Sequence, residues 1–325
     1  MKLLIKKMKK MKKNKNLQSI IHGDCTKEMQ KIKSEKVDLI IADPPYWKVI
    51  GQKWDYQWRT EDDYIKWSLE WMTEASRVLR KGGTFYLFGY FRTLALLVPY
   101  FQNLGLELRQ QIILDKGMRS VSGRATKNYK IFPNVTESAL MIVKNSKPFI
   151  KDLLKSRQKE LGLSSKEIND GLGVKSNGGG MWSIYSGDNV CEQVPTLELW
   201  EKLQKVLKFE YPYEKLSQTF NPQMGVTDVW RDIDFYSEVR HHPTQKPAKL
   251  IERLIKASSN KGDLILDPFA GSGSTVVAAT TLERHFITIE KDENYHAIVK
   301  KRITEHNNPL ANFISAPAYK ESLLL

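Results

Sequence analysis

Cysteine is scarce in this 325-residue chain, and long apolar segments are missing. The two cysteines, Cys25 and Cys191, make no disulfide framework and no zinc spacing, which fits a reducing compartment. No apolar run approaches the roughly 20 residues of a membrane span. The amino-terminal segment has no long apolar core and no small-residue cleavage site, so it is not typical of a signal peptide. These absences predict a soluble cytoplasmic protein without a membrane partner.

Acidic residues are absent from the first 15 positions, which carry eight lysines. Those lysines supply more than half of the net charge of +14, so the rest of the chain carries only +6. Such a run is typical of a solvated, disordered tail, here residues 1–16. Tail lysines can also attract phosphates without sequence preference. Charge therefore supports a nucleic-acid partner without establishing one.

Strand-like and helical segments alternate along most of the chain. Strands are expected at 17–24, 37–45, 84–89, 104–116, 137–145, 264–267 and 285–290, and helices at 25–36, 64–83, 248–263, 274–284 and 291–306. The helix at 64–83 is expected to end on its two glycines. This alternation predicts an α/β fold with a mostly parallel sheet that helices cover on both faces. Ligands of such sheets bind outside the carboxyl ends of the strands.

The stretch from 151 to 220 has a different texture. It is helix-rich, and its charges sum to zero. The segment LGLSSKEINDGLGVKS, followed by PTLELWEKLQKVL, resembles the helix-turn-helix of phage-repressor type, although a plain helical lid or packing insert explains it equally well. We therefore expect a helical insert, a candidate target-recognition region, within a catalytic domain formed by 17–150 and 221–308. Residues 309–325 are expected to form a carboxyl-terminal tail.

The segment LILDPFAGSGSTVVAA, residues 264–279, is typical of a strand, a glycine-rich turn and a helix. Gly271 and Gly273 allow a ligand to approach the backbone closely. No lysine precedes the Ser-Thr pair, so this is not a phosphate-binding Walker loop, and Val276 replaces the third glycine of a dinucleotide fingerprint. Glu290, at the end of the next strand, is placed to accept hydrogen bonds from both hydroxyls of a ribose. The pattern predicts a nucleoside cofactor such as S-adenosylmethionine; the alternative is a glycine-rich turn beside a surface glutamate.

The segment VDLIIADPPYWK, residues 37–48, ends a buried strand on a carboxylate, which two prolines and two aromatic residues follow. A strand end with an ordinary turn is the alternative, because Asp and Pro are common in turns. DPPY and DPFAGSGS both directly follow apolar strands. The two motifs can therefore share one crevice.

Four motifs together resemble the amino-methylating DNA methyltransferases of the beta arrangement: ADPPYWK, HHPTQKPAKLIERLI, LDPFAGSGSTVVAA and ITIEKDENY. In that arrangement the catalytic motif comes first, the target-recognition region in the middle and the cofactor loop last. The resemblance covers most of residues 17–306. It implies a Rossmann-like, seven-stranded class I methyltransferase fold, S-adenosylmethionine as cofactor and double-stranded DNA as substrate. It leaves open a homodimer, a cognate restriction enzyme and a role in a restriction-modification system.

The resemblance also implies positions for the cofactor. The FAGSG turn holds the methionine end, Glu290 the ribose, Asp24 lies near the adenine, and the segment 242–247 shapes the pocket. The candidate cofactor-binding residues are Asp24, Cys25, His242, Thr244, Lys246, Asp267, Phe269, Ala270, Gly271, Ser272, Gly273, Ser274, Glu290 and Lys291.

The candidate catalytic residues are Asp43, Pro44, Pro45 and Tyr46. An exocyclic amine is a poor nucleophile because its lone pair is delocalised into the ring, and two acceptors aimed at its hydrogens favour a localised lone pair. Asp43 supplies one acceptor and the Pro44 carbonyl the other, while the prolines fix the backbone direction. Tyr46 offers a face on which the base can stack. The base must flip out of the duplex, at a cost of a few kcal/mol.

The segment from 115 to 130 carries five basic residues against one acid, and it shows no clear periodicity. Long loops in compact domains are often functional. We expect Lys116, Arg119, Arg124 and Lys127 to contact DNA; a solvated surface loop is the alternative.

The leading Asp43 favours adenine-N6 methylation at a specific site, because a serine there is commoner for cytosine-N4 methylation, which remains the alternative. Methylation of the cytosine ring needs a thiolate, usually in a Pro-Cys pair, and here Cys25 follows Asp24. The six histidines are too few and too scattered for a metal site. A non-enzymatic DNA-binding protein that uses the helical insert is the alternative of another class.

Overall fold

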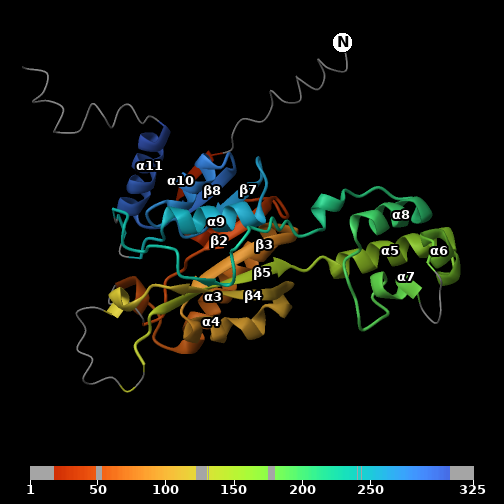
Figure 1. The fold of residues 1–325 in the computed structure, drawn as a ribbon, viewed down its shortest axis with the longest axis horizontal. Helices are drawn as coiled ribbons and strands as arrows, with labels where there is room; N and C mark the ends of the chain where they lie inside the picture. The colour runs from red at the N-terminus through yellow and green to blue at the C-terminus, as the bar shows by residue number, and fades with distance from the viewer. Residues whose placement is uncertain are drawn as a thin grey trace, which may run out of the picture.

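The computed structural model describes residues 18–48, 53–121, 130, 132–174, 180–239, 241–242 and 244–307. Within these residues a central sheet lies between two layers of helices, and a further group of helices stands beside it (Figure 1). The expected tails, residues 1–16 and 309–325, lie outside the described residues. No helix in the described part of the chain is long and apolar enough to cross a membrane.

The sheet has eight described strands in the order β1-β8-β7-β2-β3-β5-β4-β6. Only β5 runs antiparallel to its described neighbours. The expected mostly parallel sheet is thus confirmed, and the two-residue strand β6 adds an eighth strand at the edge. The strands are β1 (Gln18–His22), β2 (Val37–Ala42), β3 (Leu79–Gly89), β4 (Leu106–Asp115), β5 (Thr136–Lys144), β6 (Val229–Trp230), β7 (Leu264–Asp267) and β8 (His285–Glu290).

Strand β2 shows why helices cover both faces of the sheet. Successive side chains of a strand point to opposite faces. Ile40 and Ala42 pack in the core on the side of α3, whereas Leu39 and Ile41 pack on the side of α9, and all four are buried. The helices on the first side are α2 (Cys25–Gln30), α3 (Glu61–Val78) and α4 (Phe91–Leu97), and those on the second are α9 (Ala248–Ser258), α10 (Ser274–Thr281) and α11 (Glu293–Asn307).

The expectation that a helix ends on Gly82 and Gly83 is wrong. Helix α3 ends at Val78, and both glycines lie inside β3. They occupy a register irregularity, because Val37 pairs with Leu79 whereas Leu39 pairs with Thr84. Gly82 has a φ of +66°, and a Cβ atom there would lie 2.2 Å from the main-chain oxygen of Leu216. A distant segment, which no local pattern reveals, thus lies so close to β3 that a side chain at Gly82 would clash with it.

The helix-rich insert is present and has a hydrophobic core of its own, which includes Trp182 and Trp200. It contains α5 (Lys147–Leu161), α6 (Ser165–Leu172), α7 (Gly180–Tyr185) and α8 (Leu197–Leu207), so its first helix begins before the expected boundary at 151. A capping box of Ser164 and Glu167 begins α6, and Gly173, with a φ of +72°, ends it. These local signals set both ends of α6 but do not tell what the insert binds.

Short 3₁₀ helices occupy several connections. They are η1 (Lys53–Tyr56), η2 (Val98–Tyr100), η3 (Gln102–Leu104), η4 (Met118–Val121) and η6 (Tyr213–Lys215).

Replacing Gly82 by alanine should destabilise the protein more than replacing Gly105. Both glycines have a positive φ, but a Cβ at Gly105 would meet nothing within 4 Å. Gly105→Ala should therefore lower the unfolding free energy only by the strain of a left-handed backbone at alanine, about 1–2 kcal/mol. Gly82→Ala should cost at least about 2 kcal/mol more, because the added atom meets the backbone that leaves the insert. Urea unfolding measures both; equal losses would show that the segment at 216 does not press on β3.

Candidate active site

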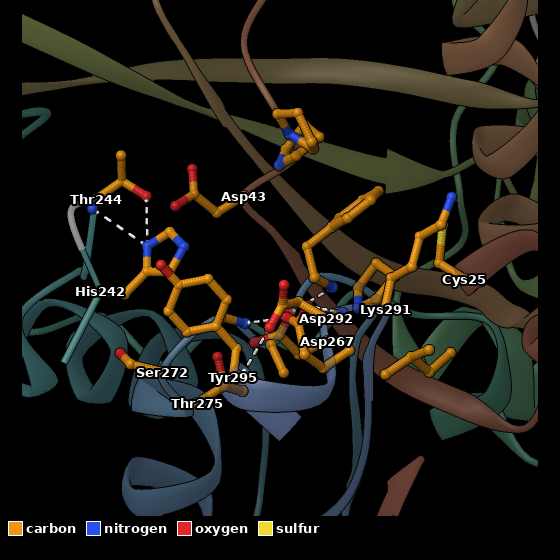
Figure 2. Close-up of a pocket in the computed structure, with 18 of the residues that line it drawn as sticks. Cys25, Asp43, His242, Thr244, Asp267, Ser272, Thr275, Lys291, Asp292 and Tyr295 are labelled. Atoms are coloured by element: carbon orange, nitrogen blue, oxygen red, sulfur yellow. Dashed lines mark hydrogen bonds between the residues drawn. The ribbon is translucent and has the colours of Figure 1, made fainter. Parts of the chain in front are cut away.

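The two loops that follow β2 and β7 open at the same edge of the sheet. The two strands are parallel neighbours, with Leu39 opposite Ile265 and Ile40 opposite Leu266. A cavity of about 500 Å³ lies at their carboxyl ends, and its lining includes both the DPPY residues and the glycine-rich turn. Figure 2 shows Asp43 on one side of this cavity and Asp267 on the other. The predicted shared crevice is confirmed.

Nearly all of the candidate cofactor residues line this cavity. The exception is Gly273, which is the N-cap of α10 and packs against Val299. Several lining residues were not predicted: Trp67 from α3, Thr275 from α10, and Asp292 and Tyr295 from the segment after β8. Asp292 and Tyr295 follow Glu290 within five positions, so their proximity to the motif was the signal that could have found them.

The glycine-rich turn is fixed from two directions. Gly271, with a φ of +52°, donates its amide to Glu290 Oε2 at 2.8 Å, and Asp292 donates its amide to Glu290 Oε1 at 2.8 Å. From α11, Arg302 donates to the main-chain oxygen of Ser272 at 2.7 Å. Burial raises the pKa of Glu290, which lines the cavity. Glu290 is therefore not a surface glutamate beside a turn, and each of its oxygens already holds one backbone amide.

Asp267 ends β7 and is almost fully buried. Its Oδ1 accepts a hydrogen bond from the Phe269 amide at 3.0 Å, and the Thr275 side chain also bonds to it. Burial raises its pKa to about 7, and the negative charges of Asp43 and Glu290 add to the rise. A carboxyl group with this pKa changes its charge near neutral pH, and a cation bound beside it would favour the ionised form.

The segment around His242 covers the glycine-rich turn. His242 Nδ1 lies 2.9 Å from Thr244 Oγ1 and accepts from the Thr244 amide at 3.2 Å. The imidazole packs edge-on against Tyr295, with ring centroids 4.3 Å apart (Figure 2). Burial lowers the pKa of His242, so the ring is neutral near pH 7. Through these contacts His242, Thr244 and Tyr295 together form one wall of the cavity.

A buried cluster of charges surrounds the DPPY motif. Lys246 donates to Asp43 Oδ2 at 2.7 Å and lies 2.8 Å from Glu137 Oε1. The hydroxyl of Tyr46 lies 2.5 Å from Asp43 Oδ1 and 2.6 Å from Glu137 Oε1. Lys116 donates to Glu137 Oε2 at 3.1 Å. The ammonium of Lys246 is thus bound to the DPPY motif, while its main-chain oxygen accepts from Ser274, the first residue of α10.

The pKa values of this cluster follow from its pairing. Burial alone would raise the pKa of Glu137, but Lys246 and Lys116 outweigh burial and hold it at about 2. Burial would likewise lower the pKa of Lys246, but Asp43 and Glu137 raise it well above its ordinary value. Burial and the same two carboxylates raise the pKa of Tyr46. Near neutral pH, Glu137 is therefore ionised, Lys246 is charged and Tyr46 keeps its proton.

Tyr46 is more enclosed than a stacking residue needs to be. Only 4% of it is exposed, and its ring meets Tyr90 edge-on with centroids 5.6 Å apart. Part of its surface lines the cavity. A base that stacks on this ring therefore requires some of the covering side chains to move.

The predicted DNA contacts are only partly described. Lys116 turns inward to Glu137, and its ammonium lies 5.6 Å from the Tyr90 ring centroid, so the geometry does not favour it as a DNA contact. Arg119 lies in η4 at the carboxyl edge of β4. Arg124 and Lys127 lie outside the described residues.

Cys25 is buried, and burial followed by the charge of Asp24 raises its pKa to about 12. Its thiol is therefore neutral near pH 7, which does not suit the thiolate chemistry of cytosine ring methylation. In the described part of the chain, no three His, Cys, Asp or Glu side chains gather as a metal site.

Comparison with protein families gives one match that spans most of the chain, a DNA methylase model over residues 37–301. The DNA adenine methyltransferase YhdJ of Escherichia coli K12 is 30% identical over 292 residues, which cover 88% of this chain and 82% of that protein. The type II methyltransferase M2.DpnII of Streptococcus pneumoniae is 28% identical over 308 residues, which cover 90% of this chain and 92% of that protein.

Solved structures share the fold. The M1.HpyAVI complex with S-adenosylmethionine has a TM-score of 0.54 at 21% identity, covering 88% of this chain and 99% of that one. A putative DNA modification methylase of Thermus thermophilus, complexed with S-adenosylmethionine, has a TM-score of 0.53 at 21% identity, covering 89% and 94%.

Proposed function

Since this chain belongs to the DNA methylase family whose model spans residues 37–301, we propose that it transfers a methyl group from S-adenosylmethionine to the N6 amine of a flipped adenine in duplex DNA. The observation that carries the proposal is that DPPY and the glycine-rich turn line one cavity. The relative YhdJ, an adenine methyltransferase by name, favours adenine. Cytosine-N4 methylation, with the same amine chemistry, is the alternative.

The cavity residues fit this cofactor. A volume of about 500 Å³ lies within the range of small-molecule sites. Asp267 is placed to pair with the ammonium of a methionine end, and Glu290 to accept from a ribose. Asp24 and Cys25, which also line the cavity, are assigned to the adenine end. Bound S-adenosylmethionine supplies the activated methyl group, and these side chains bind and orient it.

Asp43 and the Pro44 carbonyl supply the chemistry on the base. Each accepts a hydrogen bond from the amine, so the nitrogen lone pair is freed from the ring and aimed at the methyl group. Preorganised acceptors of this kind act where positive charge develops on the nitrogen. Positioning of the two reactants is the other main contribution.

Methyl transfer and the identity of its product test the role of Asp43 directly. The wild-type chain should move labelled methyl from S-adenosylmethionine to duplex DNA, and nucleoside analysis should find N6-methyladenine. Asp43→Ala should lower the rate at least about a hundredfold, because an acceptor for the amine is lost. The dissociation constant for the cofactor should stay within about threefold, since none of its assigned residues belongs to the DPPY segment. Asp62→Ala, an exposed carboxylate at the start of α3, is the matched control and should leave the rate unchanged.

Three other outcomes have distinct meanings. N4-methylcytosine in the digest would support the alternative amine. Full activity of Asp43→Ala would contradict the assigned acceptor. DNA binding without any transfer would favour a non-enzymatic DNA-binding protein.

The pH dependence of cofactor binding tests the role of Asp267. Its pKa of about 7 means that the carboxyl is neutral below pH 7, whereas the bound ammonium favours the ionised form. Binding therefore releases a proton at low pH, and affinity should rise with pH up to about 7 and then level off. The dissociation constant measured by calorimetry should be about tenfold larger at pH 6 than at pH 8. Asp267→Asn should bind more weakly with little pH dependence; a wild-type affinity independent of pH would contradict the assignment.

We also propose that Arg119, Arg124 and Lys127 contact DNA and that the helical insert is the target-recognition region. Three features support this role for the insert. It has a separate core, its helices α6 and α7 have a left-handed glycine between them, and it stands beside the sheet (Figure 1). We also propose a cytoplasmic location, which the scarcity of cysteine supports. A second copy of the chain and a cognate restriction enzyme are proposals that rest on the resemblance to type II methyltransferases alone.

Removing the three loop charges should weaken DNA binding to a similar extent for every DNA sequence. The variant Arg119→Ala/Arg124→Ala/Lys127→Ala should bind all duplexes less tightly, and the slope of log affinity against log salt should fall by about 0.9 for each phosphate that the variant no longer neutralises. Cofactor binding should be unchanged. The control is Lys31→Ala/Lys33→Ala/Lys36→Ala, three exposed lysines at the amino end of β2, opposite the cavity. Fluorescence anisotropy measures both; equal effects would mean that the loop has no special role.

A further inference from the structure

Two side chains, those of Tyr46 and Lys246, contact the carboxylate of Asp43, and both of them also contact Glu137. Tyr46 and Lys246 each contact one oxygen of Asp43, at 2.5 and 2.7 Å. Both also contact Glu137 Oε1, at 2.6 and 2.8 Å. Glu137 is 4% exposed and comes from β5, which carries neither of the two motifs.

The fold brings Glu137 to this place. Strand β5 is antiparallel to β3 and β4, so its first residues lie at the edge where its neighbours end. Glu137 is the second residue of β5 and pairs with Leu114 near the end of β4. It therefore reaches the cavity edge from the side opposite the cofactor loop.

The cluster is balanced in charge. Asp43 and Glu137 carry two negative charges, and Lys246 and Lys116 carry two positive ones. Buried ion pairs seldom add net stability, because desolvation costs about as much as pairing returns. Removing one partner is costly, however, since it leaves a buried charge uncompensated. The three charged groups beside the acceptor carboxylate therefore point to a role in placing that carboxylate.

The phenol of Tyr46 adds a constraint. It has one hydrogen and two carboxylate oxygens within reach, so at any moment it donates to Asp43 or to Glu137. The charge on Glu137 also attracts the ammonium of Lys246 away from Asp43. Both donors are thus shared, and the lone pairs of Asp43 remain partly available to an incoming amine.

We propose that Glu137 is a positioning residue for methyl transfer, which holds Lys246 and Tyr46 so that the Asp43 carboxylate is fixed and its acceptor oxygens stay available. The inference rests on the proposed function, because it takes Asp43 as the acceptor for the amine. Lys116 fixes Glu137 in turn through the other oxygen.

The test is a charge-balance cycle measured by single-turnover methyl transfer. Glu137→Gln leaves the cluster with an excess positive charge, Lys246→Met leaves an excess negative charge, and the double variant is neutral again. Glu137→Gln should slow transfer about 10- to 100-fold, while the dissociation constants for cofactor and DNA stay within about twofold. The double variant should transfer faster than Lys246→Met alone, because groups that act as a unit are not additive.

Two further variants complete the design. Glu137→Asp keeps the charge with a shorter reach, so it should lose less activity than Glu137→Gln. Glu107 lies on the neighbouring strand β4, where its carboxylate pairs with Arg109 and Lys147. The variant Glu107→Gln removes this carboxylate and should transfer at the wild-type rate. If Glu137→Gln fails to bind cofactor, the comparison of Glu137→Asp with the wild type decides the outcome.

The results distinguish a failure of the proposed function from a failure of the positioning role of Glu137. A wild-type chain that transfers no methyl group would overturn the proposed function and this inference with it. Wild-type transfer with an unaffected Glu137→Gln would overturn the positioning role alone. A loss that matches lost folding or cofactor binding, with additive effects in the cycle, would also overturn it, because that is the signature of a structural residue.

Discussion

The parallel pairing of β2 with β7 is the constraint on which the rest of the site depends. It joins segments from opposite halves of the sequence, and it places the carboxyl ends of both strands at one edge of the sheet. Both strands are buried on two faces, so a shift in register would move apolar side chains such as Ile40 out of one core and into the other. The cores of the two helical layers thereby fix the distance between the DPPY loop and the glycine-rich turn.

The electrostatics of the cavity separate its carboxylates by environment. Glu137 has two ammonium partners, which hold its pKa at about 2, whereas the burial of Asp267 raises its pKa to about 7. Burial also raises the pKa of Glu290, although backbone amides of the turn oppose the rise. Groups of the same chemical type are in this way prepared for different tasks, a pattern that is common in active sites. Lys246 joins the DPPY motif to the segment after the glycine-rich turn, because its ammonium donates to Asp43 and its carbonyl accepts from Ser274.

Much of this arrangement could be predicted from the sequence, because it depends on local patterns. Apolar runs followed by Asp-Pro identified β2 and β7, and their alternation with helices predicted the layers. What was missed depends on contacts between distant segments. Glu137 is the second residue of an ordinary-looking strand, and only the antiparallel direction of β5 brings it to Tyr46 and Lys246. Gly82 lies in a strand directly against the backbone of Leu216, and the buried Tyr46 bonds to two carboxylates, one of them from a distant strand.

The central claim is that one cavity presents a methyl donor to a base amine held by Asp43. A crystal structure of this chain with S-adenosylmethionine and a duplex that carries a flipped adenine tests this most directly. The account predicts that the methyl carbon points away from the turn at 269–271 toward the base, with the adenine N6 bonded to the Asp43 carboxylate and the Pro44 carbonyl. A cofactor whose methyl group faces away from Asp43, or a base amine bound by other residues, would contradict it.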